Sequence, residues 1–320
     1  FLPLDLQPYR VHFAIFGVCV LTLMNMRGVK ESVLPLVPIF LTFIITHFFV
    51  IIYGLFVHAS DFPQLVDSTA REIQTTHSQV GFAGLMFLIL RAYSMGAGTY
   101  TGIEAVSNSM SVLREPKVQT AKKTMQYMSW SLAFMVMGLM TTYLLFNVSD
   151  QPGKTLNAVL FENVVNTWQA PFGTIFVWVS LISEALILFV AAQAGFLGGP
   201  GVLANMALDR WFPTKFASLS DRLVTQNGVL LMGLAALLTM IFTHASVHIL
   251  VVLYSINVFI TFCFSQAGMV RHWWKVRDTV KGWVKKIFIN GLGLLLTSFI
   301  LVSVITLKFF EGGWITLVIT

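Results

Sequence analysis

Long apolar segments alternate with short polar ones along the whole chain. A helix needs about 20 mostly apolar residues to cross a bilayer, and eight segments of the sequence meet that requirement. A further apolar segment begins at residue 313. We therefore predict an all-α membrane protein with about eight transmembrane helices and the start of a ninth. The eight segments are residues 9–26, 33–57, 81–110, 126–148, 171–206, 227–244, 247–268 and 287–309.

The composition agrees with this class of protein. Hydrophobic residues make up 56% of the 320 residues and charged residues 11%, whereas a soluble domain usually carries about 25% charged residues. The mean hydropathy is +0.79. The net charge of +6 gathers in loops between the spans, so it does not indicate a nucleic-acid partner. Cys19 and Cys263 lie inside spans, without the spacing of a disulfide framework or a zinc site, and we expect no cofactor.

Lys and Arg residues indicate the orientation, because cytoplasmic loops carry an excess of them. Fifteen of the 20 basic residues lie in four alternate loops, and four lie on the opposite side. This asymmetry predicts a multi-pass protein of the cell membrane whose chain starts outside. We expect outer loops at residues 58–80 and 149–170, the second with a short helix at 155–165. The basic inner loops are residues 27–32, 111–125, 207–226 and 269–286.

The last inner loop, residues 269–286, carries three Trp residues among its six basic ones. A segment of basic and aromatic residues is typical of a helix lying in the membrane interface. The sequence therefore predicts an interfacial helix on the inner leaflet.

The polar stretch 91–108, RAYSMGAGTYTGIEAVSN, interrupts the third span. Gly weakens a helix, and Ser and Thr compete for its backbone hydrogen bonds. Irregular backbone at membrane depth occurs where it is buried in protein or lines a wet cavity. We therefore predict a helix broken at residues 94–102, whose free carbonyl and N–H groups help to form a solute site, as in transporters. The residues expected to build the break are Gly96, Gly98, Thr99, Tyr100 and Gly102.

Glu104 follows the break, three residues after Thr101. An acid at membrane depth is costly and by default functional, although Glu104 could instead only cap the second half-helix, where negative charge is favoured. If this turn is helical, the Thr101 hydroxyl and the Glu104 carboxylate share a face. A potassium filter replaces the water of the ion with oxygen ligands, and these two side chains offer such oxygens.

Two further residues stand out at membrane depth. Glu184 lies in the segment SLISEALIL of the fifth span. It is either a proton relay or a buried acid paired with a neighbour such as Arg91, and the sequence leaves both readings open. Tyr254 lies in the middle of a later span, where an aromatic residue alone more often packs than binds a solute.

Several blocks resemble the amino acid–polyamine–organocation permease superfamily. They are NMRGVKES at residues 25–32, TGIEAVSN at 101–108 and REPKxxxAKKTM at 114–125. More closely, TGIEAVSN together with SDRLVTQNGV (220–229) and LYSINVFITFCFSQAGMVRHWW (253–274) resembles KimA-type potassium uptake permeases, which are proton-coupled. The similarity runs across nearly the whole chain.

The resemblance implies a LeuT-like, APC-type fold with two inverted five-helix repeats. Residues 1–320 are then expected to be a partial transmembrane permease domain, without the first three helices of the family and without its cytoplasmic C-terminal domain. The resemblance also implies a homodimer and a potassium site that includes Thr101, Glu104 and Tyr254. Glu184 and the run Gly198-Gly199-Pro200-Gly201 depart from the family pattern.

These observations favour a secondary active transporter over an enzyme, because the sequence has no nucleophile–base arrangement, phosphate loop or metal cluster. We predict proton-coupled potassium uptake by alternating access around residues 94–102, with the lipid bilayer and the transported ion as partners. An amino acid permease of the same fold is the alternative, in which half-helix N–H groups hold the substrate carboxylate and Glu104 faces its amino group. A non-transporting membrane sensor or scaffold is a second alternative, and it predicts no solute-accessible site.

Overall fold

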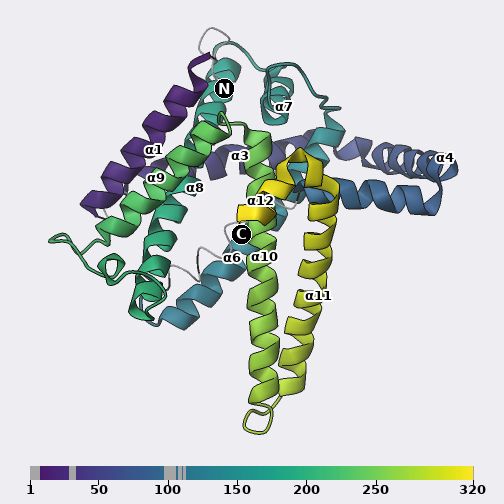
Figure 1. Ribbon diagram of the computed structural model, residues 1–320. Helices are drawn as coiled ribbons and strands as arrows, with labels where there is room; N and C mark the ends of the chain where they lie inside the picture. Colours follow the sequence, from purple (N-terminus) through teal and green to yellow (C-terminus); the bar gives the residue numbers. More distant parts are fainter. Residues whose placement is uncertain (1–7, 29–33, 97–105, 107–109, 111–112, 320) are drawn as a thin grey trace. The chain divides into compact units, whose positions relative to one another are not determined.

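The computed structural model describes residues 8–28, 34–96, 106, 110 and 113–319. All regular elements of these described residues are helices (Figure 1). Six of the described segments are long and apolar enough to cross a membrane, while α7 (Leu156–Val165) and α9 (Gln226–Phe242) are shorter apolar helices. The predicted all-α membrane class is thereby confirmed. The six segments are α1 (Arg10–Arg27), α3 (Val37–Val57), α6 (Lys117–Leu145), α8 (Phe172–Leu208), α10 (Val247–Lys275) and the stretch Trp283–Val318.

The described residues form two compact units. The first draws on Phe1–Arg71 and Gly102–Phe242, and the second on Glu72–Thr101 and Thr243–Thr320. Beyond the helices above, the first unit holds η2 (Leu34–Leu36), η3 (Ala59–Asp61), η6 (Thr214–Phe216) and the first residues of α4 (Phe62–Gly96). The second unit holds the rest of α4, α10, α11 (Trp283–Lys308), η7 (Phe309–Gly313) and α12 (Trp314–Ile319).

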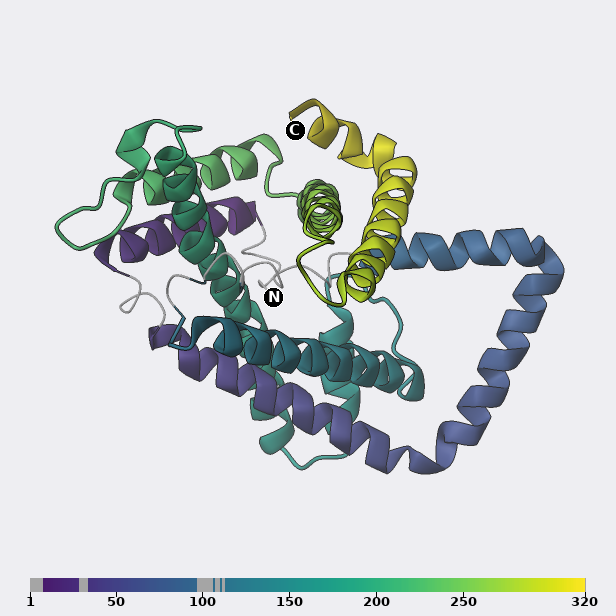
Figure 2. The same ribbon diagram turned by 90° about the horizontal axis from the view of Figure 1, so that it is seen from below.

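Helix α8 is the centre of the first unit and contacts α1, α3, α7 and α9. Its 37 residues correspond to about 55 Å, which exceeds the roughly 30 Å of the bilayer hydrocarbon core. Small residues let α9 approach it closely: a Cβ atom added to Gly228 would lie 2.9 Å from the Pro200 Cβ. Helix α8 continues through the run Gly198-Gly199-Pro200-Gly201 to Leu208. Around α8, α3 and α6 run side by side, as do α1 and α9 (Figure 2).

Apolar side chains from separate helices hold each unit together. In the first unit, Leu160 and Phe161 of α7 are fully buried against α3 and α8. In the second, α10 and α11 pack along their length around Val252, Ile256 and Val304. The short helix α7, expected within the outer loop, is thus confirmed and is anchored by its apolar face.

A reciprocal amide pair joins α1 to α8 inside the first unit. The Asn25 Nδ2 donates to the Gln193 Oε1 at 2.7 Å, and the Gln193 Nε2 donates to the Asn25 Oδ1 at 2.8 Å. Both side chains are buried, and the Asn25 amide also donates to the Leu21 carbonyl at 2.8 Å. An unpaired amide in an apolar interior is costly, so each side chain depends on the other.

We expect Gln193→Met to lower the free energy of unfolding by about 1–3 kcal/mol, because it leaves the buried Asn25 Oδ1 without its donor. Asn25→Leu should do the same. The double variant should lose less than the sum of the two, with a coupling of about 0.6–1.7 kcal/mol, as for paired polar groups in other membrane helices. Denaturant unfolding of the four proteins in detergent measures this cycle. Strictly additive losses would contradict the pairing.

Two sequence predictions about loops are wrong. Residues 58–80 were expected to be an outer loop, but η3 and then α4 make them helical. This segment has no Gly and no Pro beyond Pro63, so nothing in it stops a helix. The chain bends at Gly81, with φ 70° and ψ 176°, where the apolar span was predicted to begin. The segment 269–286 is also not an interfacial helix: α10 continues to Lys275, and a short turn leads to α11 at Trp283.

Candidate functional site

Most residues of the predicted broken helix lie outside the described part of the chain. Helix α4 is described up to Gly96, which is exposed and would have open space around an added Cβ atom. The break at residues 94–102 beyond that point therefore stays a prediction, as does the role of the acid and the hydroxyl next to it. The residues concerned are Gly98, Thr99, Tyr100, Thr101, Gly102 and Glu104.

Tyr254, the third residue of the predicted potassium site, is described. It lies on α10, with the fully buried Val252 and Ile256 two positions to either side. Its own side chain is 45% exposed within the chain. The phenol is thus on a side of α10 away from the core that this helix forms with α11.

A cluster of polar side chains surrounds Glu184 inside the first unit. The Tyr143 hydroxyl, on α6, donates to the Asn157 Oδ1. The Asn157 Nδ2, on α7, donates to the Glu184 Oε1, on α8. Three consecutive helices therefore meet in one hydrogen-bonded chain of Tyr143, Asn157 and Glu184. Together with Ser180, one turn before Glu184 on α8, we call these residues the Glu184 cluster.

The start of α7 positions Asn157 for this contact. Thr155 caps the helix, and its Oγ accepts a hydrogen bond from the Ala158 N–H at 3.2 Å. A capped first turn fixes the direction of the side chains that follow it. The apolar residues Leu160 and Phe161 then bury the rest of α7, so the Asn157 amide is held between α6 and α8.

The cluster leaves a negative charge poorly compensated. The Glu184 Oε2 is buried and has no hydrogen-bond partner among the described residues, and the same holds for the Ser180 Oγ. The described hydrogen bond to Glu184 comes from a neutral amide. None of the described cations forms an ion pair with Glu184, and an unpaired carboxylate at membrane depth is unfavourable, so a bound proton or cation stabilises it. The Ser180 hydroxyl lies on the same face of α8 and can either accept or donate a hydrogen bond.

The structure thus gives Glu184 a partner that the sequence did not indicate. Its described hydrogen bond is to Asn157, where the sequence reading had suggested Arg91. Tyr143, Asn157 and Ser180 were missed altogether. A signal was present for Asn157, because an amide in the first turn of an otherwise apolar helix is out of place unless it has a partner. Tyr143 and Ser180 resemble ordinary residues of a span.

His47 is a separate buried polar group, on α3. It is fully buried, its ring packs edge-on against Phe161 at 5.2 Å, and its Nδ1 lies 2.9 Å from the Phe43 carbonyl. Because a carbonyl only accepts, the Nδ1 carries the hydrogen of this contact. The His47 ring is thus part of the packed interior of the first unit.

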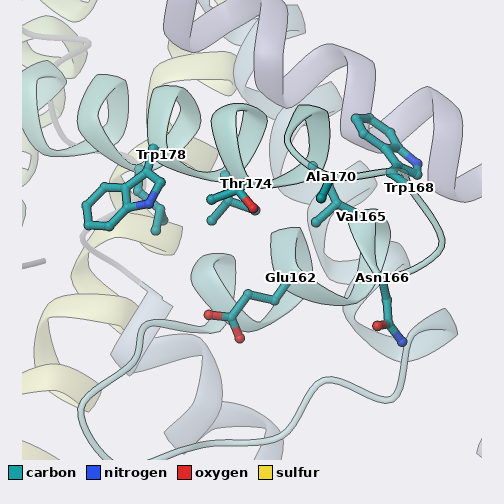
Figure 3. Close-up of a pocket in the computed structure, with 10 residues that line it drawn as sticks. Glu162, Val165, Asn166, Trp168, Ala170, Thr174 and Trp178 are labelled. Atoms are coloured by element: carbon teal, nitrogen blue, oxygen red, sulfur yellow. The ribbon is translucent and has the colours of Figure 1, made fainter.

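A hollow lies between α7 and the start of α8, and the residues that line it are near the Glu184 cluster in the sequence. Figure 3 shows Glu162 of α7 and the following Asn166 on one side and Thr174 and Trp178 of α8 on the other, around a cavity of about 530 Å³. The Glu162 carboxylate is already paired with Lys154, 2.6 Å from its amine, and both are more than 40% exposed. Exposed pairs of this kind are screened by water, so this hollow does not share the unbalanced charge of Glu184.

A second acid, Asp61 in η3, lies beyond the end of α3. The His58 Nδ1 lies 2.7 Å from the Asp61 Oδ2, and this hydrogen bond lowers the pKa of the Asp61 carboxyl below its ordinary value. Asp61 lines a polar hollow of about 380 Å³ with Gln64, Ser68 and Asn147. The acid is exposed and paired, which makes it an ordinary surface carboxylate. The Glu184 cluster is therefore the candidate site among the described residues.

Comparisons with known proteins agree with the transporter reading. A sequence model of the amino acid permease family matches residues 4–313. The chain is 31% identical, over 318 residues, to the potassium transporter KimA of Bacillus subtilis (strain 168), an alignment that covers 98% of this chain and 49% of that protein. The chain thus spans about half the length of this curated relative. These matches confirm the resemblance expected from the sequence blocks.

Proposed function

The chain belongs to the amino acid permease family, and from this membership we propose that it is a secondary active transporter that takes up potassium ions together with protons. The similarity to a potassium transporter along nearly the whole chain carries the proposal. It favours potassium over the alternative of an amino acid substrate, although the family as a whole bears the amino acid permease name.

We propose that Thr101, Glu104 and Tyr254 bind the potassium ion. The support for Thr101 and Glu104 is their oxygen chemistry and spacing next to the Gly-rich stretch, since oxygen ligands replace the water shell of this ion. The support for Tyr254 is its partly exposed position on α10. Alternating access would then occur around residues 94–102, as in transporters that bind their solute at a broken helix.

Glu184 is the acid that we propose to carry the coupling proton. Its buried and unpartnered Oε2 supports this role, because protonation removes a charge that the surrounding groups do not balance. The Ser180 hydroxyl would accept a hydrogen bond from the protonated acid and donate one to the carboxylate. Asn157 donates to the other oxygen in both states, so the position of the side chain is kept while its charge changes.

The proposal places the protein in the cell membrane as a homodimer, with the chain start outside. The excess of Lys and Arg in alternate loops supports this orientation.

Uptake of a labelled solute tests the transported species directly. Expression of the protein in a potassium-uptake-deficient strain should restore growth on low potassium and should give rubidium uptake that rises with an inward proton gradient. A set of labelled amino acids, offered to the same cells, should not enter faster than in cells with an empty vector. If an amino acid enters and rubidium does not, the protein is an amino acid permease.

A further inference from the structure

The turn between α10 and α11 forms a basic and aromatic tip in the second unit. The two helices pack side by side, and residues 276–282 connect them at one end (Figure 1). Gly282 makes this tight connection possible with a left-handed φ of 76° and precedes the first residue of α11. We call the segment 271–286 the hairpin tip.

Positive charge at the hairpin tip is almost unopposed. Asp278 is the one acidic residue of the segment, and it lies 3.8 Å from the Arg277 guanidinium. Helix α11 has no acidic residue in its first turn and no side-chain cap. Its N-terminal N–H groups therefore add to the positive potential. The basic residues of the tip are Arg271, Lys275, Arg277, Lys281, Lys285 and Lys286.

Two of these cations are held over indole rings. The Lys286 Nζ lies 4.1 Å from the centre of the Trp273 ring, and the Arg277 Cζ lies 5.0 Å from that of Trp274. Trp274 in turn packs edge-on against Trp283 at 6.1 Å. These contacts fix the direction of the cationic groups, so the tip is an ordered surface rather than a set of independent lysines.

One hydrogen-bond donor at the tip is unused. The Trp273 Nε1 is buried and has no acceptor among the described residues. The ammonium of Lys286 lies over the same indole. Because the Nε1 is buried, the groups that an anionic oxygen meets at the surface are the cations held over the indole rings, Lys286 and Arg277.

We propose that the hairpin tip binds the phosphate of an anionic phospholipid at the inner membrane surface, with Lys286 and Arg277 as the contact groups and the Trp273 ring beneath Lys286. The lengths of the helices support a lipid over a soluble anion. The 29 residues of α10 correspond to about 43 Å, so the helix reaches beyond a hydrocarbon core of roughly 30 Å. Indole rings at such a helix end lie at the level of the headgroups.

Brominated lipids test the site, because bromine quenches the fluorescence of a Trp that it contacts. The protein is reconstituted in phosphatidylcholine vesicles that contain a fixed fraction of either brominated phosphatidylglycerol or brominated phosphatidylcholine. The difference between the parent and Trp273→Phe isolates the signal of Trp273. We expect the anionic lipid to quench this signal at a lower mole fraction than the neutral lipid. Each removed basic residue should weaken that preference about fivefold.

The variants Arg277→Gln/Lys286→Gln and Lys122→Gln/Lys123→Gln form a matched pair. The first should lose the preference for the anionic lipid, and the second, which removes two cations from α6, should keep it. Lys286→Arg should also keep it, which separates loss of charge from loss of folding. Equal quenching by the two lipids, or equal behaviour of the two double variants, would show the proposal to be wrong. Competition by soluble glycerol phosphate would overturn it in favour of a free phosphate site.

Discussion

Glu184→Gln is expected to abolish uptake driven by a proton gradient while rubidium exchange across the membrane continues. Gln has nearly the shape of Glu and can still accept from the Asn157 amide. It cannot bind or release a proton at neutral pH. If Glu184 carries the coupling proton, the cycle stops at the step that returns the empty protein, whereas exchange of one bound ion for another avoids that step. A role in packing alone would affect both activities equally.

Proteoliposomes with an imposed pH gradient measure the two activities on one preparation. Net accumulation of rubidium in Glu184→Gln should fall to the level of empty vesicles. Its exchange of external for internal rubidium should stay within about twofold of the parental rate, a change of well under 1.4 kcal/mol, which would be tenfold. Glu162→Gln is the matched control, because Glu162 is a nearby acid that is exposed and paired with Lys154. It should behave like the parent. Normal gradient-driven accumulation in Glu184→Gln would rule out the proton role.

Glu104→Gln is expected to remove potassium uptake and exchange together. A contact with a charged group contributes roughly 1.5–3 kcal/mol, so its loss should weaken binding by about tenfold to a hundredfold. The neutral ligands contribute less. Thr101→Ala and Tyr254→Phe should therefore raise the rubidium concentration for half-maximal uptake and leave the maximal rate largely intact.

Growth on low potassium and rubidium flux give this comparison, with membrane abundance as the control for folding. The contrast with Glu184 distinguishes the two acids: the Glu104 variant should lose exchange, and the Glu184 variant should keep it. A Glu104→Gln protein that is present at the parental level and transports rubidium at the parental rate would remove this residue from the potassium site.

Hydropathy determined the helices because the bilayer sets the length of an apolar segment. The predicted spans at 9–26, 33–57 and 171–206 agree with α1, α3 and α8 to within a few residues. Helix α4 bends at Gly81, the predicted start of the third span, but the sequence did not predict this bend. The prediction failed for residues 58–80. Their polarity was taken to indicate a loop, but the segment has no helix-breaking residue beyond Pro63 and is helical.

The sequence by itself singled out Glu184 as an acid at membrane depth, because the hydropathy of the surrounding segment shows that it lies within a span. Only the tertiary structure decided which groups meet it. Tyr143 and Asn157 reach Glu184 because α7 folds back between α6 and α8. In the same way, Asn25 and Gln193 pair across 168 positions of sequence. Hydrophobic pattern fixes how deep a side chain lies, but the rotation and packing of the helices select its partner.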